Sequence, residues 1–128
     1  MGSNSPQETA QALAKALSAG DADGVLSQYE EDAAFIPPGA PASNPVRGQA
    51  ALRDTMGQFL ALNPTLTIET DKVIEVEEIA LVTGSWSLTG SGPDGDVNMS
   101  GRYVDVMRRQ SDGTWLYVID NPDGVENA

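Results

Sequence analysis

The chain has 128 residues, with 19 acidic residues against 7 basic ones and a formal net charge of -12. So acidic a chain repels nucleic acid and anionic membranes, and neither is expected as a partner. It has no cysteine or histidine, which excludes disulfides, thiolate nucleophiles, a Ser-His-Asp arrangement and the usual zinc ligands. Acid–base chemistry must therefore use Asp, Glu, Tyr, Lys or water, and the sequence implies no metal and no organic cofactor.

The length is that of one domain, predicted to span residues 1–128 with flexible ends at 1–5 and 123–128. No apolar run reaches the roughly 20 residues of a membrane-spanning helix. The first residues, MGSNSPQE, lack the basic and apolar regions of a secretory signal. A cytoplasmic location is expected, although an exported protein whose signal had been removed would carry the same sequence.

Two helices are predicted at the start of the chain. The first has Ser5 as its N-cap and Pro6 at its first helical position, and it ends at Gly20. The second is short, is capped by Asp21 and extends through Tyr29, with apolar residues on its buried side.

A short strand, a loop and a third helix are predicted next. The strand covers residues 32–36 and is stopped by two prolines, and the loop at 37–47 is rich in Pro, Gly, Ala, Ser and Asn. The third helix runs from about Gln49 to Leu62, before the Asn-Pro at residues 63–64.

From residue 65 the apolar period changes from that of a helix to that of a strand. Four strands are predicted at 65–76, 79–89, 97–109 and 114–120, with turns at 90–96 and 110–113. Helices followed by a strand meander predict an α+β domain in which a curved antiparallel sheet wraps against the N-terminal helices.

The last two strands meet at Asp112-Gly113, a strong hairpin signal. A two-residue turn there would place Asp105 directly opposite Asp120. A four-residue turn would place Asp105 opposite Val118 instead. In the first register two carboxyl groups share one face of the sheet, and one pKa should rise because close like charges oppose ionisation.

Both faces of this hairpin are apolar. With the two-residue turn, one face is predicted to hold Tyr103, Asp105, Met107, Leu116, Val118 and Asp120. The other is then predicted to hold Val104, Val106, Trp115, Tyr117 and Ile119. Because the helices can cover only one face, the second predicts contact with another subunit. A two-fold homodimer is the default expectation, with a different partner chain as the alternative.

Three segments of the chain together resemble the nuclear-transport-factor-2-like superfamily. They are ALSAGDADGVLSQYEEDAAFIPPG, VRGQAALRDTMGQFL and DGTWLYVIDNP. Within this superfamily, the chain looks most like the SnoaL-like and ketosteroid-isomerase-like small proteins. The resemblance implies a cone-shaped, cystatin-like fold with an internal pocket between sheet and helices. The pocket lining implied by this comparison and by strand placement comprises Tyr29, Phe35, Phe59, Trp86, Met107 and Val118.

The resemblance to ketosteroid isomerases is incomplete at the functional positions. Their general base corresponds to Pro37, or to Ile36 if the alignment slips by one residue, and their oxyanion-hole tyrosine falls near Leu13. Only their second acidic residue is matched, by Asp105. Steroid isomerisation proper is therefore not expected.

The epoxide hydrolases of this superfamily use two aspartates on neighbouring strands and an arginine two positions before the first. Asp105 and Asp120 match the aspartates in placement, whereas Tyr103 stands at the arginine position. We therefore take Asp105, Asp120 and Tyr103 as candidate catalytic residues. Their structural alternatives are a buried carboxyl tied to donors for Asp105, a turn-forming residue for Asp120 and a wall residue with a bonded hydroxyl for Tyr103.

These observations predict a protein that binds a small hydrophobic or carbonyl compound and uses Asp105 for proton transfer or water addition. The alternative is a non-catalytic ligand-binding protein or dimeric assembly module on the same fold.

Overall fold

The structure, a computed structural model, describes residues 3–126. Its helices are α1 (Pro6–Ser18), α2 (Ala22–Leu26) and α3 (Gln49–Leu60). The predicted cap of α1 is confirmed, because the Ser5 side chain accepts a hydrogen bond from the Glu8 N–H at 3.2 Å. Asp21 likewise caps α2 through the Gly24 N–H at 3.0 Å.

Two helix ends differ from the prediction. The second helix stops at Leu26, and Tyr29 begins a strand, with its N-terminal neighbour Gln28 accepting a sheet hydrogen bond from the Tyr117 N–H at 2.8 Å. Pairing with the distant last strand therefore outweighs the local helical pattern. The third helix ends at Leu60, two residues earlier than expected, and is followed by Asn63 at a φ of 50°.

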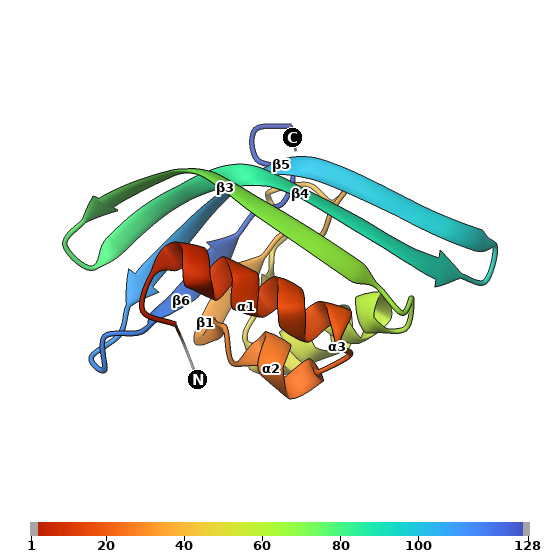
Figure 1. Cartoon of the computed structure of the whole chain (residues 1–128), viewed down its shortest axis with the longest axis horizontal. Helices are drawn as coiled ribbons and strands as arrows, with labels where there is room; N and C mark the ends of the chain where they lie inside the picture. Colours follow the sequence, from red (N-terminus) through yellow and green to blue (C-terminus); the bar gives the residue numbers. More distant parts are fainter. Residues whose placement is uncertain (1–2, 127–128) are drawn as a thin grey trace.

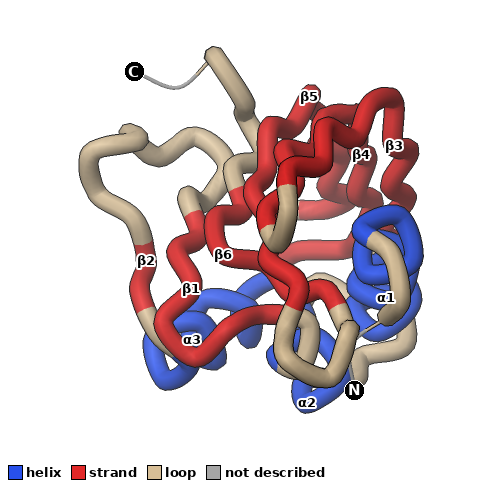
Figure 2. The backbone as a smooth tube through the Cα atoms, turned by 90° about the vertical axis from the view of Figure 1, so that its left-hand side faces the viewer, coloured by secondary structure: helices blue, strands red, loops and turns tan. Residues whose placement is uncertain are grey.

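The strands are β1 (Tyr29–Phe35), β2 (Val46–Arg47), β3 (Thr65–Val76), β4 (Ile79–Gly92), β5 (Gly95–Arg109) and β6 (Trp115–Asp120). They form a six-stranded sheet in the order β2-β1-β6-β5-β4-β3. All neighbours are antiparallel except β1 and β6, which pair in parallel. The long strands β3, β4 and β5 arch over α1 (Figure 1), and all three helices gather under the concave side of the curled sheet (Figure 2). This confirms the predicted fold class.

The hairpin between β5 and β6 has the predicted strand pairing at Val106, although its loop and its register near the turn differ from the prediction. Gln110 N–H donates to the Thr114 carbonyl at 2.7 Å and Gly113 has a φ of 87°, so the loop is one residue longer than the predicted turn. Met107 consequently pairs with Tyr117, but a bulge then shifts the register so that Val106 pairs with Ile119.

The longer loop exchanges the two faces of β6 near the turn. Trp115 and Tyr117, predicted on the outer face, are 2% and 1% exposed and lie on the inner side, so neither offers surface to a partner. Leu116 and Val118, predicted on the inner face, are less buried and lie outside. The bulge restores the predicted faces beyond it, with Asp120 buried and Ile119 exposed.

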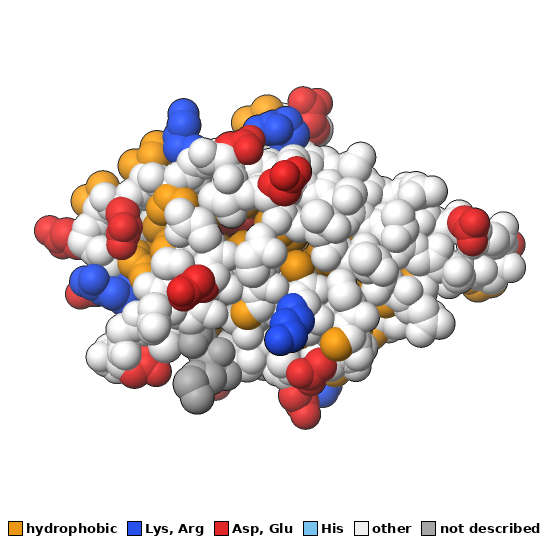
Figure 3. Space-filling view, in the orientation of Figure 1, with side chains coloured by type: hydrophobic (Ala, Val, Ile, Leu, Met, Phe, Trp, Pro, Cys, Tyr) orange, Lys and Arg blue, Asp and Glu red, His pale blue; other side chains and the backbone are white. Residues whose placement is uncertain are grey.

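The convex face of the sheet carries an apolar row that crosses four strands. Strand pairing aligns Ile74, Leu81, Val106 and Ile119, and Val76 and Ile79 pair beside them. Ile74, Leu81 and Ile119 are 49%, 37% and 38% exposed. Figure 3 shows hydrophobic side chains gathered at the end of the molecule where β3 and β4 meet. We call these six residues the outer row.

The predicted flexible ends lie partly outside the described residues, and that prediction stays untested. Within the described part, Ser3 bridges to Trp115, and Asp123 accepts a hydrogen bond from the Gly39 N–H at 2.8 Å. Among residues 3–126, no helix combines the length and apolar character needed to cross a bilayer.

Candidate functional site

A cavity of about 70 Å³ lies between the concave side of the sheet and the helices. Its lining is mostly hydrophobic, with an acidic and aromatic group at one end: Leu13, Leu17, Tyr29, Phe35, Pro38, Met56, Phe59, Leu66, Ile68, Trp86, Leu88, Tyr103, Asp105, Tyr117, Asp120 and Pro122. The volume exceeds the roughly 10–15 Å³ that one water needs and is below the roughly 300 Å³ of a drug-sized site. The cavity therefore suits a ligand of few non-hydrogen atoms.

Asp105 on β5 and Asp120 at the end of β6 meet at the wall of this cavity. Both side chains are buried, at 3% and 7% exposure, and their carboxyl groups share a hydrogen bond. Asp105 also accepts a hydrogen bond from the Asn121 N–H at 2.7 Å. Asp120 accepts one from the Tyr29 hydroxyl. The two aspartates therefore come together as predicted, although a longer hairpin loop and a bulge stand in place of the predicted two-residue turn.

Burial changes the acidity of both carboxyl groups. It raises the pKa of Asp105 well above the ordinary value of 3.8, and the neighbouring charge of Asp120 raises it further, against the Asn121 hydrogen bond. Burial also raises the pKa of Asp120, to about 6, against the hydrogen bonds from Tyr29 and Asp105 that favour its charged form. Near neutral pH the pair therefore shares one proton and one negative charge, and Asp105, whose pKa is raised further, holds the proton more strongly.

Three tyrosines surround the pair, and their hydroxyl groups differ in what they bind. Tyr29 donates to Asp120, and its ring stacks on that of Tyr117 with centroids 5.1 Å apart. The Tyr103 hydroxyl lies 3.0 Å from the Thr70 hydroxyl and donates to the Glu69 carbonyl at 3.3 Å. Because its hydroxyl is bonded in this way, Tyr103 contributes its ring to the cavity wall. This agrees with the structural alternative for Tyr103, a wall residue with a bonded hydroxyl.

The hydroxyl of Tyr117 makes no hydrogen bond within residues 3–126, although the side chain is buried and lines the cavity. Burial raises the pKa of Tyr117 well above 10.0, and the charges of Asp105 and Asp120 add to this effect. The Tyr117 hydroxyl is therefore available to form a hydrogen bond with a ligand. Sequence reasoning missed this residue because the assumed turn placed it on the opposite face.

The other predicted lining residues divide into two groups. Tyr29, Phe35, Phe59 and Trp86 line the cavity as expected. Met107 is instead packed in the core at 0% exposure. Val118 lies outside the cavity, because the three-residue hairpin loop changes the face of β6 on which it lies. Leu13, at the position of the isomerase tyrosine, lines the cavity with a side chain that cannot donate a hydrogen bond.

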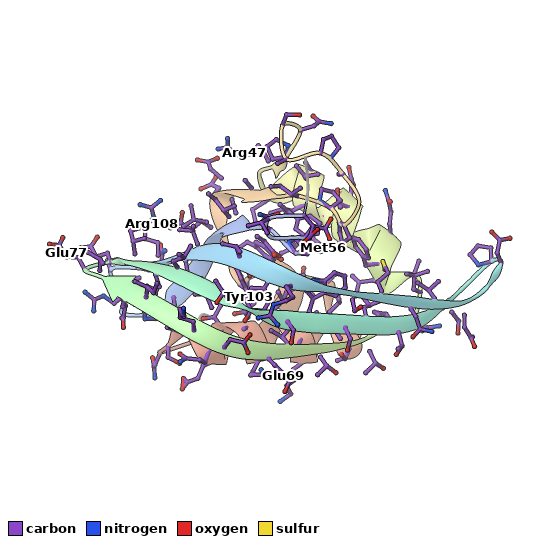
Figure 4. All side chains as sticks on the ribbon, turned by 90° about the horizontal axis from the view of Figure 1, so that it is seen from above. Arg47, Met56, Glu69, Glu77, Tyr103 and Arg108 are labelled. Carbon is purple, nitrogen blue, oxygen red and sulfur yellow. The ribbon has the colours of Figure 1, made fainter. Side chains whose placement is uncertain are left out.

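Among the described residues, no basic side chain lines the cavity. Arg47 donates to the Asp32 carbonyl at 3.2 Å and lies at the edge of the molecule, whereas Tyr103 lies over the middle of the long strands (Figure 4). In the described part of the chain, no three carboxylate side chains gather so as to hold a metal ion.

A curved sheet over helices, with a cavity between them, defines the class of nuclear-transport-factor-2-like, cystatin-like folds. The chain belongs to the SnoaL-like domain family, whose model matches residues 10–118. No curated protein matches the sequence.

Several solved structures share the fold. A protein of Novosphingobium aromaticivorans described as a proposed aromatic ring hydroxylase is similar at 25% identity and a TM-score of 0.79, covering 93% of this chain and 85% of that one. An NTF2-like protein with a cystatin-like fold from the same organism has 14% identity and a TM-score of 0.76, covering 94% and 80%. A ketosteroid isomerase-like protein from Erwinia carotovora atroseptica has 18% identity and a TM-score of 0.70, covering 89% and 88%.

Proposed function

We propose that the cavity binds a small hydrophobic or carbonyl-bearing molecule and that the Asp105–Asp120 pair catalyses proton transfer on it. The observation that carries this proposal is a hydrogen-bonded pair of buried carboxyl groups at the wall of an apolar cavity. One member is a proton donor and the other an acceptor near neutral pH, which suits concerted acid–base catalysis.

The step conserves atoms and electrons. The Asp120 carboxylate takes a proton from the carbon next to a carbonyl group, and the electron pair of the broken C–H bond forms a carbon–carbon double bond. The carbonyl oxygen takes the proton of Asp105, which yields an enol. Return of a proton to carbon regenerates the carbonyl compound, or an isomer where a second carbon accepts it. The ring of Tyr103 supports the pair as cavity wall.

Proton transfer is tested by hydrogen exchange into butanone, which is small enough for the cavity. In heavy water near neutral pH, the wild type should speed deuterium incorporation next to the carbonyl above the buffer rate, as followed by NMR. Asp105→Asn and Asp120→Asn should each lower the enzyme-dependent rate by about 100-fold or more, because each removes one proton-transfer group.

The control for this exchange is Asp94→Asn, which removes a charge from an exposed residue in the turn between β4 and β5. It should exchange like the wild type. A wild type that exchanges no faster than buffer would reject proton transfer on carbonyl compounds. An Asp105→Asn variant at the wild-type rate would reject the role of Asp105.

The outer row favours the second candidate function, a dimeric assembly. We propose that two copies of the chain pair through this face. The row is uncharged. The strand register places Lys72, Arg102 and Arg108 on the same face as Glu69, and Arg102 and Arg108 form ion pairs with Asp71 and Glu30. Two chains that each carry a net charge of -12 repel least where acidic charge is offset in this way. Val104, Val106 and Ile119 of the predicted interface lie on this face.

Dimerisation is tested by sedimentation velocity. The wild type should sediment at twice its chain mass of 13.4 kDa, and Leu81→Asp should sediment as a monomer because it buries a charge at the centre of the row. Gln58→Asp places the same charge on exposed α3, on the helix side of the sheet, and should stay dimeric. A monomeric wild type would argue against self-pairing and favour a different partner chain.

A further inference from the structure

The negative charge in the cavity lacks a positive partner among the described residues. Within residues 3–126, the lining contains two carboxyl groups and no lysine or arginine. Tyr29 stabilises Asp120 with a neutral hydroxyl, and the salt bridges of the described chain all lie elsewhere, at Arg53, Arg102 and Arg108. Buried carboxylates in proteins are as a rule paired with a cation or a metal. A ligand that supplies a positive charge would complete this site.

Tyr117 is the second, independent observation. Its side chain is 1% exposed, lines the same cavity and has a hydroxyl without a partner in residues 3–126. A hydroxyl oxygen can accept a hydrogen bond from an ammonium group. A primary ammonium has three N–H donors, and the Asp120 carboxylate and the Tyr117 oxygen are acceptors that line the same cavity.

The rest of the lining fits the remainder of such a ligand. The rings of Trp86, Phe35 and Phe59 and the side chains of Leu13 and Leu17 surround the space. Aromatic rings attract cations through their faces, and the hydrophobic side chains accommodate a short alkyl group. An anion of the same size would instead meet the charge of Asp120 without any compensating cation.

We propose that the cavity selects small alkylammonium ions, with the ammonium group between Asp120 and Tyr117 and the alkyl group among the hydrophobic side chains. This inference goes beyond the proposed function, since it names a charged ligand that competes for the same cavity with the neutral carbonyl compound. Because Asp120 is also the base of the proposed reaction, a bound alkylammonium ion blocks that reaction.

The test compares butylamine, butanol and butyrate, which have the same chain length and differ in charge. Binding is followed by chemical-shift changes of the Tyr117 and Trp86 resonances near neutral pH, at constant ionic strength. Butylamine should bind at least about tenfold more tightly than butanol, since a charged hydrogen bond is stronger than a neutral one. Butyrate should not bind.

Variants connect that preference to the two groups. Asp120→Asn should weaken butylamine binding at least about tenfold while leaving butanol binding within about twofold. Tyr117→Phe should weaken butylamine binding several-fold, because it removes one of the hydrogen bonds that the ammonium group donates. Asp94→Asn is the matched control and should bind butylamine like the wild type. Equal affinity for butylamine and butanol, or loss of both in Asp120→Asn, would overturn the inference.

Butanone exchange separates this inference from the proposed function. Exchange that butylamine inhibits competitively supports both. Exchange that butylamine leaves unchanged overturns the amine inference alone. Butylamine binding by a protein that does not catalyse exchange supports charge selection and rejects the proton-transfer proposal.

Discussion

Replacing Asp120 with asparagine is expected to raise the free energy of unfolding near neutral pH by about 3 kcal/mol, which is the free-energy equivalent of moving a pKa from 3.8 to about 6. In the folded wild type, burial disfavours the charged form of this carboxyl group, whereas the unfolded chain ionises it freely. Asparagine keeps an oxygen that can accept from Tyr29 and carries no charge.

The pH dependence follows from the direction of the pKa shift. Because the folded pKa lies above the unfolded one, the stabilising contribution of neutral Asp120 is fully present below about pH 4. It is lost as the pH rises through the folded value of about 6 and is constant above it. The wild type and Asp120→Asn should therefore have similar stability in acid and diverge between about pH 4 and pH 7.

Urea unfolding at matched protein concentration measures this difference. Asp94→Asn removes an exposed charge and should stay within about 0.5 kcal/mol of the wild type at both ends of the pH range. Parallel pH profiles for the wild type and Asp120→Asn would show that Asp120 titrates normally in the fold. The proton-sharing pair would then have to be abandoned.

Replacing Gly84 with alanine is expected to destabilise the fold by about 3 kcal/mol or more, at the upper end of what overpacking costs. A β-carbon at Gly84 would lie 2.0 Å from the Glu69 carbonyl oxygen and 2.7 Å from the Tyr103 hydroxyl. Gly84 pairs with Tyr103 across β4 and β5, and it faces the bulge of β3 between Thr70 and Lys72. The missing side chain lets the Tyr103 ring cross β4 to reach Thr70.

Thermal unfolding of Gly84→Ala and Gly57→Ala measures this effect. Gly57 lies on the exposed side of α3, and a β-carbon there meets nothing within 4 Å. Its replacement should stabilise the protein by about 0.5–1 kcal/mol through helix propensity. If Gly84→Ala is as stable as the wild type, the close approach of Tyr103 to β3 is not a constraint on the fold.

The carboxyl pair shows how local and distant effects combine at the site. Alternation along two strands joined at Asp112-Gly113 predicted that Asp105 and Asp120 would meet. The loop residue Gly113 adopts a positive φ and lengthens the turn, which by itself would have separated them. The bulge at Val118 shifts the register back, and β6 contains no glycine that would have indicated a bulge. Only pairing with both β1 and β5 determines that register.

The helix caps, the span of β3, the α+β class and the apolar character of both sides of the last hairpin could all be predicted from the sequence. These features depend on residues close together in the chain, where capping side chains and side-chain period act directly. The tertiary structure alone decided that Tyr29 is a strand residue bonded to Asp120 and that Tyr117 faces the cavity. It also placed Met107 in the core and Val118 outside. Each of these outcomes depends on strand register between distant segments, and a shift of one residue moves a side chain to the opposite face.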